Sequence, residues 1–150
     1  MYSLREGQKS DLPCVLELIN ELALYEKAPE QVTNTLERME KEGFGPQPVY
    51  GFYVCVKESS QEIIGIAVYY YRYSTWKGQT MYLEDIIVTE SMRGKGIGKM
   101  LIEKLIEEAK EKGFKRITWQ VLDWNEPAIN FYKKFNAKFD PEWVNVTIEC

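Results

Sequence analysis

Apolar residues recur at spacings of three and four positions in four stretches of the chain, a period that predicts four amphipathic helices. The predicted helices cover residues 12–26, 33–42, 97–112 and 125–135. A capping Ser10-Asp11 pair followed by Pro13 begins the first helix. Gly43 and Gly113 are expected to end the second and third helices.

Runs rich in β-branched and aromatic residues lie between these stretches and predict strands. They cover residues 2–5, 50–57, 62–73, 80–89, 116–122 and 144–149, so the predicted order is βααβββαβαβ. Short connections among the early strands favour antiparallel pairing, whereas strand, helix and strand from Thr80 through Leu122 favour a parallel crossover. We therefore expect one α/β domain with a mixed sheet over residues 1–150, because no linker or repeat divides the chain.

Composition narrows the functional classes. With 45% hydrophobic residues the chain is globular, and no apolar run is long enough to span a membrane. It has no histidine, which excludes Ser-His and Cys-His nucleophile pairs and histidine metal sites. Three widely spaced cysteines and a polar start without a secretion signal favour the reducing cytoplasm, and no metal is expected. The net charge of −4 disfavours nucleic acid and suits a cationic substrate.

A segment rich in glycine and cations joins the strand at 80–89 to the third helix. It reads Arg-Gly-Lys-Gly-Ile-Gly-Lys at 93–99. Glycines there let backbone N–H groups turn toward an anion at a helix N-terminus, so the segment predicts a phosphate site. Met100 stands where a Walker loop needs Ser or Thr, and Lys99 stands where GxGxxG needs its third glycine. A flexible connection without a ligand is the alternative.

Three ordered segments resemble one enzyme family. Arg93, Gly96 and Gly98 match the (Q/R)-x-x-G-x-(G/A) pyrophosphate motif of the GNAT superfamily of acetyl-CoA-dependent N-acetyltransferases. YLEDIIV at 82–88 and DWNEPAINFYKKFNA at 123–137 are similar to its diamine (spermidine/spermine) and thialysine N-acetyltransferase branch. The resemblance implies a GNAT-like fold and acetyl-CoA as co-substrate.

The resemblance also implies roles around the co-substrate. Backbone groups of Ile86, Ile87 and Val88 would pair with the pantetheine arm, and Asn125 would contact the co-substrate. The pyrophosphate would be wrapped by the loop residues Arg93, Gly94, Lys95, Gly96, Ile97, Gly98 and Lys99. Tyr132 would face the sulfur and stabilise the leaving thiolate. For Asn125 helix capping, and for Tyr132 a place in an aromatic core, are the structural alternatives.

An amine substrate with a pKa near 10.4 is protonated at neutral pH, so the reaction needs a base. Without histidine, Glu84 and Asp85 are the leading carboxylates, acting through an ordered water. A regular strand would turn them to opposite faces, and only a bulge would bring both to one site. We assign Glu84 as base or water anchor, and Asp85 to the remote cation of the substrate.

The substrate side is expected to hold aromatic and acidic residues, which attract ammonium groups. Tyr25 and Glu26 match a family segment that meets the polyamine, Trp76 would line the entrance, and Glu142 is a weaker candidate. Ser74 follows Tyr73 where the diamine enzymes have an acidic residue. The chain therefore looks like the branch acting on thialysine and related lysine-like amines.

Direct acetyl transfer to a primary amine of a small cationic substrate is the function these residues favour. A non-catalytic acetyl-CoA-binding regulatory module and a protein lysine or N-terminal acetyltransferase are the alternatives. Family members usually pair as homodimers through the C-terminal strand, which the resemblance implies for this chain as well.

Overall fold

The α/β pattern of the sequence is confirmed by a computed structural model that describes all residues from 1 to 150. The chain divides into two units, which we call the sheet unit, Met1–Trp119, and the C-terminal unit, Gln120–Cys150. The sheet unit contains β1 (Tyr2–Glu6), α1 (Leu12–Tyr25), α2 (Leu36–Phe44), β2 (Gly51–Lys57), β3 (Ile63–Ser74), β4 (Gly78–Val88), α3 (Ile97–Glu111) and β5 (Ile117–Thr118). The C-terminal unit contains α4 (Glu126–Lys133).

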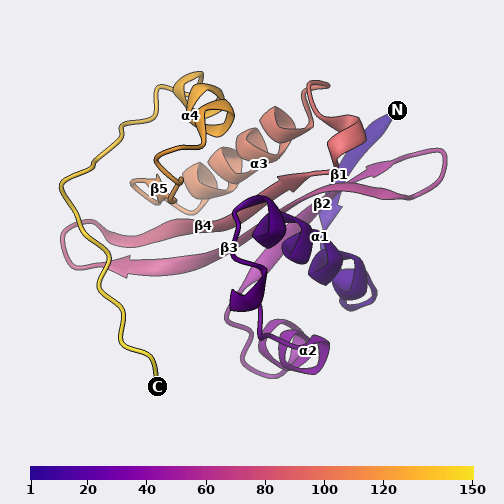
Figure 1. The fold of residues 1–150 in the computed structure, drawn as a ribbon, viewed down its shortest axis with the longest axis horizontal. Helices are drawn as coiled ribbons and strands as arrows, with labels where there is room; N and C mark the ends of the chain where they lie inside the picture. Colours follow the sequence, from indigo (N-terminus) through magenta and orange to yellow (C-terminus); the bar gives the residue numbers. More distant parts are fainter. The chain divides into compact units, whose positions relative to one another are not determined.

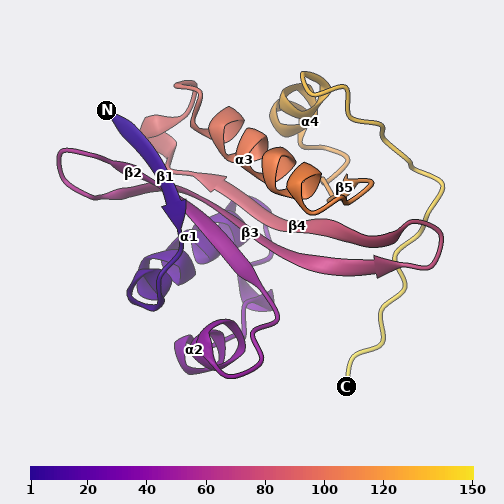
Figure 2. The same cartoon turned by 180° about the vertical axis from the view of Figure 1, so that it is seen from behind.

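The five strands form one sheet in the order β1-β2-β3-β4-β5. The first four pair antiparallel, and β4 pairs with β5 in parallel, so both predicted kinds of connection are confirmed. Helices α1 and α2 lie on one side of this sheet and α3 lies on the other (Figures 1 and 2). The sheet therefore carries two separate helix-covered faces.

Alternation along the strands supplies each face with its own core. On the α1 face, residues such as Val15, Met39, Val54 and Ile66 form one buried cluster. On the α3 face, Gly65 lets the helix approach closely, because a Cβ there would lie 2.9 Å from a methyl group of Ile97. The two cores fix the orientation of every side chain on β3 and β4.

Among the helices, α2 departs most from the sequence prediction of residues 33–42. Helix α2 begins at Leu36, because Thr35 accepts a hydrogen bond from the backbone N–H of Arg38 and caps it. It continues through Gly43 to Phe44, so the expected stop at Gly43 is wrong. Helix α1 begins at Leu12 as predicted, after a 3-10 turn at Lys9–Asp11.

Asp11 does not cap α1 with its side chain. Its carboxylate instead accepts from both guanidinium N–H groups of Arg5, at 2.7 and 3.0 Å, and from the backbone N–H of Gln8. The side-chain hydrogen bond from Arg5 lowers the pKa of Asp11. This partly buried pair ties β1 to the entry of α1.

The final strand predicted at 144–149 is wrong, because this segment has no regular secondary structure. Trp143, Val144, Val146 and Ile148 are 75–89% exposed, so the alternating pattern has no partner strand in this chain to pair with. The strand predicted at 116–122 is also shorter, covering only Ile117–Thr118. The reason lies in the neighbouring strand, β4.

Candidate active site

Strand β4 contains a β-bulge at the two acidic residues that the sequence singled out. Val68 of β3 lies opposite Asp85, and the next residue, Tyr69, lies opposite Leu83, so Glu84 is the extra residue. A bulge bends its strand and ends regular pairing. It therefore also explains why β5 stays beside β4 only at Met81 and Tyr82.

The bulge turns both acids toward the α1 face of the sheet. Asp85 pairs with Val68, which belongs to the core on that face. Together with burial, the negative charge of Glu84 raises the pKa of Asp85, Tyr70 and Tyr82. Tyr70 and Tyr82 pair with each other across the two strands, which places them on the same face as Asp85. The bulge that Glu84 and Asp85 need in order to face one site is therefore present.

Glu26, directly after the end of α1, completes an acidic cluster with Glu84 and Asp85. Burial, Glu84 and Glu26, in that order of importance, raise the pKa of Asp85 to about 6. Burial likewise raises the pKa of Glu26. Asp85 is partly buried, and no cation forms an ion pair with any of the three carboxylates. Such a cluster attracts a proton or a cationic ligand.

Aromatic side chains border the acidic cluster on the same face. The rings of Tyr70 and Tyr82 lie 5.2 Å apart, and the guanidinium of Arg72 lies 5.2 Å from the centre of the Tyr82 ring. Tyr25, also expected at the substrate side, is 45% exposed at the end of α1. Trp76 is 81% exposed in the turn between β3 and β4.

The sequence analysis did not single out Tyr82 or Arg72. The signal that could have found them is the alternation along the predicted strand at 62–73, which puts Tyr70 and Arg72 on one face. The sequence alone does not distinguish Arg72 from an ordinary exposed charge, because its neighbours on β4 depend on the pairing of the two strands.

Beyond the bulge, one edge of β4 has no strand partner. Ile86 and Ile87 pair with β3 on one side, whereas β5 ends at Thr118 on the other. Backbone groups of a strand point alternately to its two edges, so this segment offers hydrogen bonds to an extended ligand. The carbonyl oxygen of Val88 accepts instead from Nε of Arg93, at 3.2 Å.

The glycine loop leads into α3 without a side-chain cap. Gly94 and Gly96 have φ angles of 77° and 84°, which only glycine adopts readily, and Gly96 is the N-cap residue. No acidic residue lies in the first turn of α3. Lys95 is exposed, and Lys99 forms only an exposed ion pair with Glu103. Open N–H groups, a helix dipole and cations fit an anionic phosphate.

In the C-terminal unit, Asn125 is buried and caps α4 by accepting from the backbone N–H of Ala128, at 3.4 Å. The capping alternative for Asn125 is thus confirmed. Tyr132 is buried in α4, and its ring lies 5.6 Å from that of Phe131. Glu142 is exposed after α4.

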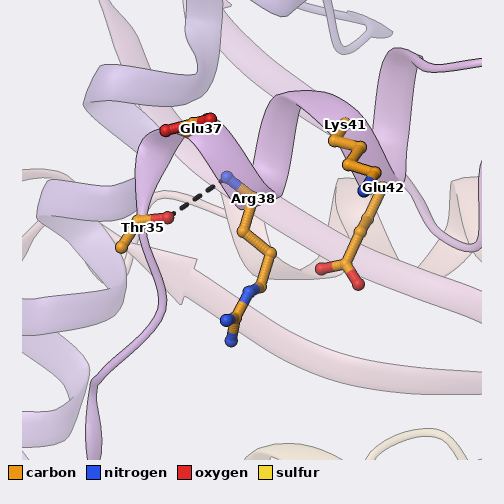
Figure 3. A pocket seen from close by; sticks show the side chains of 5 residues that line it. All are labelled: Thr35, Glu37, Arg38, Lys41 and Glu42. Carbon is orange, nitrogen blue, oxygen red and sulfur yellow. Dashed lines mark hydrogen bonds between the residues drawn. The ribbon is translucent and has the colours of Figure 1, made fainter.

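A separate hollow of about 320 Å³ lies against α2, away from the predicted site residues (Figure 3). Its lining consists of Thr35, Glu37, Arg38, Lys41 and Glu42. Two cations and two anions line it, so its charges balance and favour neither an anionic nor a cationic ligand. The acidic cluster and the glycine loop therefore remain the candidate active site.

No helix of the protein combines the length and the apolar content needed to cross a bilayer.

Solved structures support the architecture. The chain superposes on a tetramutant of the BH1408 protein from Bacillus halodurans with a TM-score of 0.78, covering 97% of this chain and 99% of that one at 23% identity. An acetyltransferase from Trypanosoma brucei gives a TM-score of 0.76, with 99% and 100% coverage at 22% identity. At these identities the likeness shows the fold alone.

Sequence comparison goes further. The chain is 40% identical to thialysine N-epsilon-acetyltransferase of Bos taurus over 141 residues, 90% of this chain and 83% of that protein. It is 32% identical to spermidine/spermine N(1)-acetyltransferase-like protein 1 of Homo sapiens over 91% of this chain and 20% of that protein. Residues 15–137 match the model of the acetyltransferase (GNAT) family. The chain therefore belongs to this family and is an N-acetyltransferase.

Proposed function

We propose that this N-acetyltransferase transfers the acetyl group of acetyl-CoA directly to a primary amine of a small cationic substrate of the lysine-like or polyamine class. The observation that carries the proposal is the bulge in β4, which turns Glu84 and Asp85 to one face beside Glu26. Three carboxylates without a cation partner attract a substrate ammonium group more strongly than a single surface charge would.

Glu84 acts as the base or as the anchor of a water that accepts the proton. A lysine-type amine must lose its proton before it attacks, at a cost of about 4–5 kcal/mol at neutral pH. Glu84 is exposed on the bulge and is accessible to a water and to the incoming amine. Asp85, which is more buried, holds the second cationic group or the ammonium form before deprotonation.

The glycine loop and the open edge of β4 are proposed to hold the co-substrate, which supplies the acyl group and a thiolate leaving group. Backbone N–H groups of Gly94 to Lys99 bind the pyrophosphate, and the side chains of Arg93, Lys95 and Lys99 neutralise its charge. Backbone groups of Ile86, Ile87 and Val88 hold the extended arm. The uncapped N-terminus of α3 supports this assignment.

In the C-terminal unit, Tyr132 is proposed to donate a hydrogen bond to the departing sulfur and Asn125 to contact the co-substrate while capping α4. A phenol with an ordinary pKa near 10 is a weaker acid than a thiol, so a hydrogen bond strengthened in the transition state is sufficient. This assignment needs residues of both units, so we propose that residues 1–150 act as one catalytic domain.

On the substrate side, Tyr25, Glu26, Trp76 and Asp85 are proposed to receive the amine, with Glu142 as a weaker contributor. The relatives named for thialysine and for spermidine/spermine support small amines. A serine at position 74 favours lysine-like amines over long polyamines, because it offers no charge to a remote ammonium group.

An acetylation assay over a panel of amines tests the proposal. Thialysine, lysine, spermidine and 1,3-diaminopropane are compared side by side with acetyl-CoA, and release of free thiol is measured. We expect turnover of at least one amine, with thialysine or lysine ahead of spermidine. Binding of acetyl-CoA without turnover of any amine would identify a regulatory module, and turnover of peptides alone would identify a protein acetyltransferase.

We further propose a homodimer formed through the C-terminal segment. The exposed side chains of Val144, Val146 and Ile148 alternate along an extended chain, and a second copy would bury them. Sedimentation of the full chain should give a dimer, and Val146→Asp should weaken it more than Thr147→Asp. A wild-type monomer would overturn the proposal.

Three free cysteines and a substrate of metabolite size support a cytoplasmic location, which cell fractionation tests.

A further inference from the structure

Helix α1 lies on one side of the sheet (Figure 1), and on this side the β3–β4 hairpin carries acidic residues toward one end and an arginine toward the other. Successive pairs on this face are Val68 with Asp85, Tyr70 with Tyr82, and Arg72 with Thr80. The acids therefore lie at one end of the row, the two tyrosines in the middle, and Arg72 at the end toward the turn.

Tyr82 connects the two charged ends. Its ring lies 5.2 Å from the Arg72 guanidinium. Burial and the charges of Glu84 and Asp85 raise the pKa of its hydroxyl, whereas the charge of Arg72 lowers it. Arg72 lies four positions after Val68, roughly 13 Å along a strand, and its guanidinium lies over the ring of Tyr82, one residue pair nearer the acids than its own partner Thr80. The row therefore presents opposite charges at its two ends, an arrangement that suits an elongated molecule with an amine at one end and an anionic group at the other.

A second guanidinium strengthens the cationic end. Arg116, which precedes β5, donates from Nη2 to the hydroxyl oxygen of Ser74, at 3.2 Å. Ser74 follows Tyr70 and Arg72 on the same face of β3. Neither Arg72 nor Arg116 forms an ion pair with a carboxylate of the sheet unit. Both guanidinium groups are exposed and keep donors for an anion.

We propose that Arg72, supported by Arg116, binds the carboxylate of the substrate, so that the enzyme selects amino acids with a terminal amine over diamines and polyamines. The reacting amine lies at the acidic cluster and the carboxylate lies over Tyr82. A diamine of the same length places its second ammonium group beside the guanidinium and is repelled. This inference rests on the proposed acetylation of a primary amine.

Three ligands of matched length test it: L-lysine, L-lysinamide and 1,5-diaminopentane. They share a terminal amine, and only lysine has a carboxylate. Binding by calorimetry and kcat/KM are both measured for the wild type and for Arg72→Gln. We expect the wild type to prefer lysine. In the variant, kcat/KM for lysine should fall about tenfold, mostly through a higher KM, because a charge-assisted hydrogen bond to the substrate is lost. Diaminopentane should be unchanged or improved.

Two further variants keep the test independent of folding. Arg72→Glu should reverse the preference toward diaminopentane, and Arg72→Lys, which keeps the charge, should retain part of the preference for lysine. Lys110→Gln removes an exposed cation from α3 on the other side of the sheet and should change nothing. A parallel loss for lysine and diaminopentane in Arg72→Gln would overturn the inference, as would equal binding of both by the wild type.

The proposed function and this inference fail in different ways. If no amine is acetylated, the proposed function fails, whereas calorimetry still measures whether Arg72 distinguishes lysine from diaminopentane. If amines are acetylated but Arg72→Gln leaves the ratio of kcat/KM values unchanged, only the inference fails.

Discussion

A single carboxylate and a cluster of three lie on opposite faces of the same sheet, and their surroundings differ. On the α3 face, Glu108 accepts hydrogen bonds from the hydroxyls of Tyr53 and Tyr71, the latter at 2.7 Å. Lys104 and Lys112 lie over the rings of these tyrosines. On the α1 face, Asp85 shares its surroundings with two other acids and no paired cation.

The difference separates a structural carboxylate from one prepared for a ligand. Burial is the main reason that the pKa of Tyr53 and of Tyr71 is raised, and the hydrogen bonds to Glu108 and its charge raise both further. These hydroxyls therefore stay protonated and act as donors. Every partner of Glu108 comes from the protein itself. Asp85 has no cation partner of this kind within the protein, and burial keeps its carboxylate poorly hydrated, which fits its proposed role in binding the substrate amine.

The largest expected effect is on the bulge. Glu84→Gln should lower kcat about 100-fold or more, because removal of a general base typically costs two to four orders of magnitude. The free energy of unfolding should change little, since Glu84 is exposed. Steady-state kinetics and urea unfolding measure the two quantities. Glu111→Gln, at the exposed end of α3, is the control; equal activity of both variants would move the base elsewhere.

Glu108→Ala should have the opposite profile. The hydroxyl of the buried Tyr53 would lose its acceptor, which costs about 2–3 kcal/mol of unfolding free energy. The kcat per folded molecule should stay within about twofold, because Glu108 lies on the other face of the sheet. Urea unfolding with activity measured in the native baseline separates these effects. A large loss of kcat at unchanged stability would contradict the comparison.

Asp85→Asn should stabilise the substrate-free protein while weakening amine binding. The folded-state pKa of about 6 lies above the ordinary value of 3.8, so ionisation of Asp85 opposes folding. Its cost is absent below about pH 4, grows as the pH rises toward 6, and is complete above it. The variant should therefore gain about 1–2 kcal/mol at pH 7.5 and nothing at pH 3.5. Thermal unfolding at both values measures this gain.

If Asp85→Asn gained the same unfolding free energy at both pH values, Asp85 would be destabilising for a reason other than its charge. Substrate amine should reverse the sign at pH 7.5, because a bound cation stabilises the ionised carboxylate of the wild type only.

The smallest effect concerns the two tyrosines that bind Glu108. Tyr71→Phe should cost about 0.5–1 kcal/mol, because Tyr71 is 40% exposed and water can replace its hydrogen bond. Tyr53→Phe should cost more, since Tyr53 is 4% exposed and Glu108 would lose a buried donor. Denaturant unfolding of the two variants gives the difference, and a larger loss for Tyr71→Phe would reverse our ranking of the two contacts.

The sequence predicted most elements, because their signals are local. The glycine at 113 stops α3, and its φ of 74° is what a C-terminal glycine supplies. The hairpin between β3 and β4 and the parallel crossover to β5 followed from run lengths and connections. The alternating residues at 144–149 misled the prediction, because the same pattern describes a strand and an extended segment without a partner.

The candidate site was predictable only in part. The residue types and spacing at Arg93–Lys99 determine a loop that has to turn its backbone outward, since glycine alone adopts these φ angles. The identity of the acids at 84 and 85 was equally plain. Their shared orientation was not, because it depends on a register shift against β3, a strand that lies several residues away along the chain.

By itself, then, the sequence determined the α/β class, the glycine-rich loop before α3 and the absence of histidine, which makes carboxylates the leading candidates for proton transfer. Only the tertiary structure decided which charges share a face. The bulge brought Glu84 and Asp85 together with Glu26, and pairing of β3 with β4 put Arg72 at the other end of that row. The pattern along one strand shows which face of the sheet a side chain points to, whereas the register between two strands decides which side chains lie next to each other.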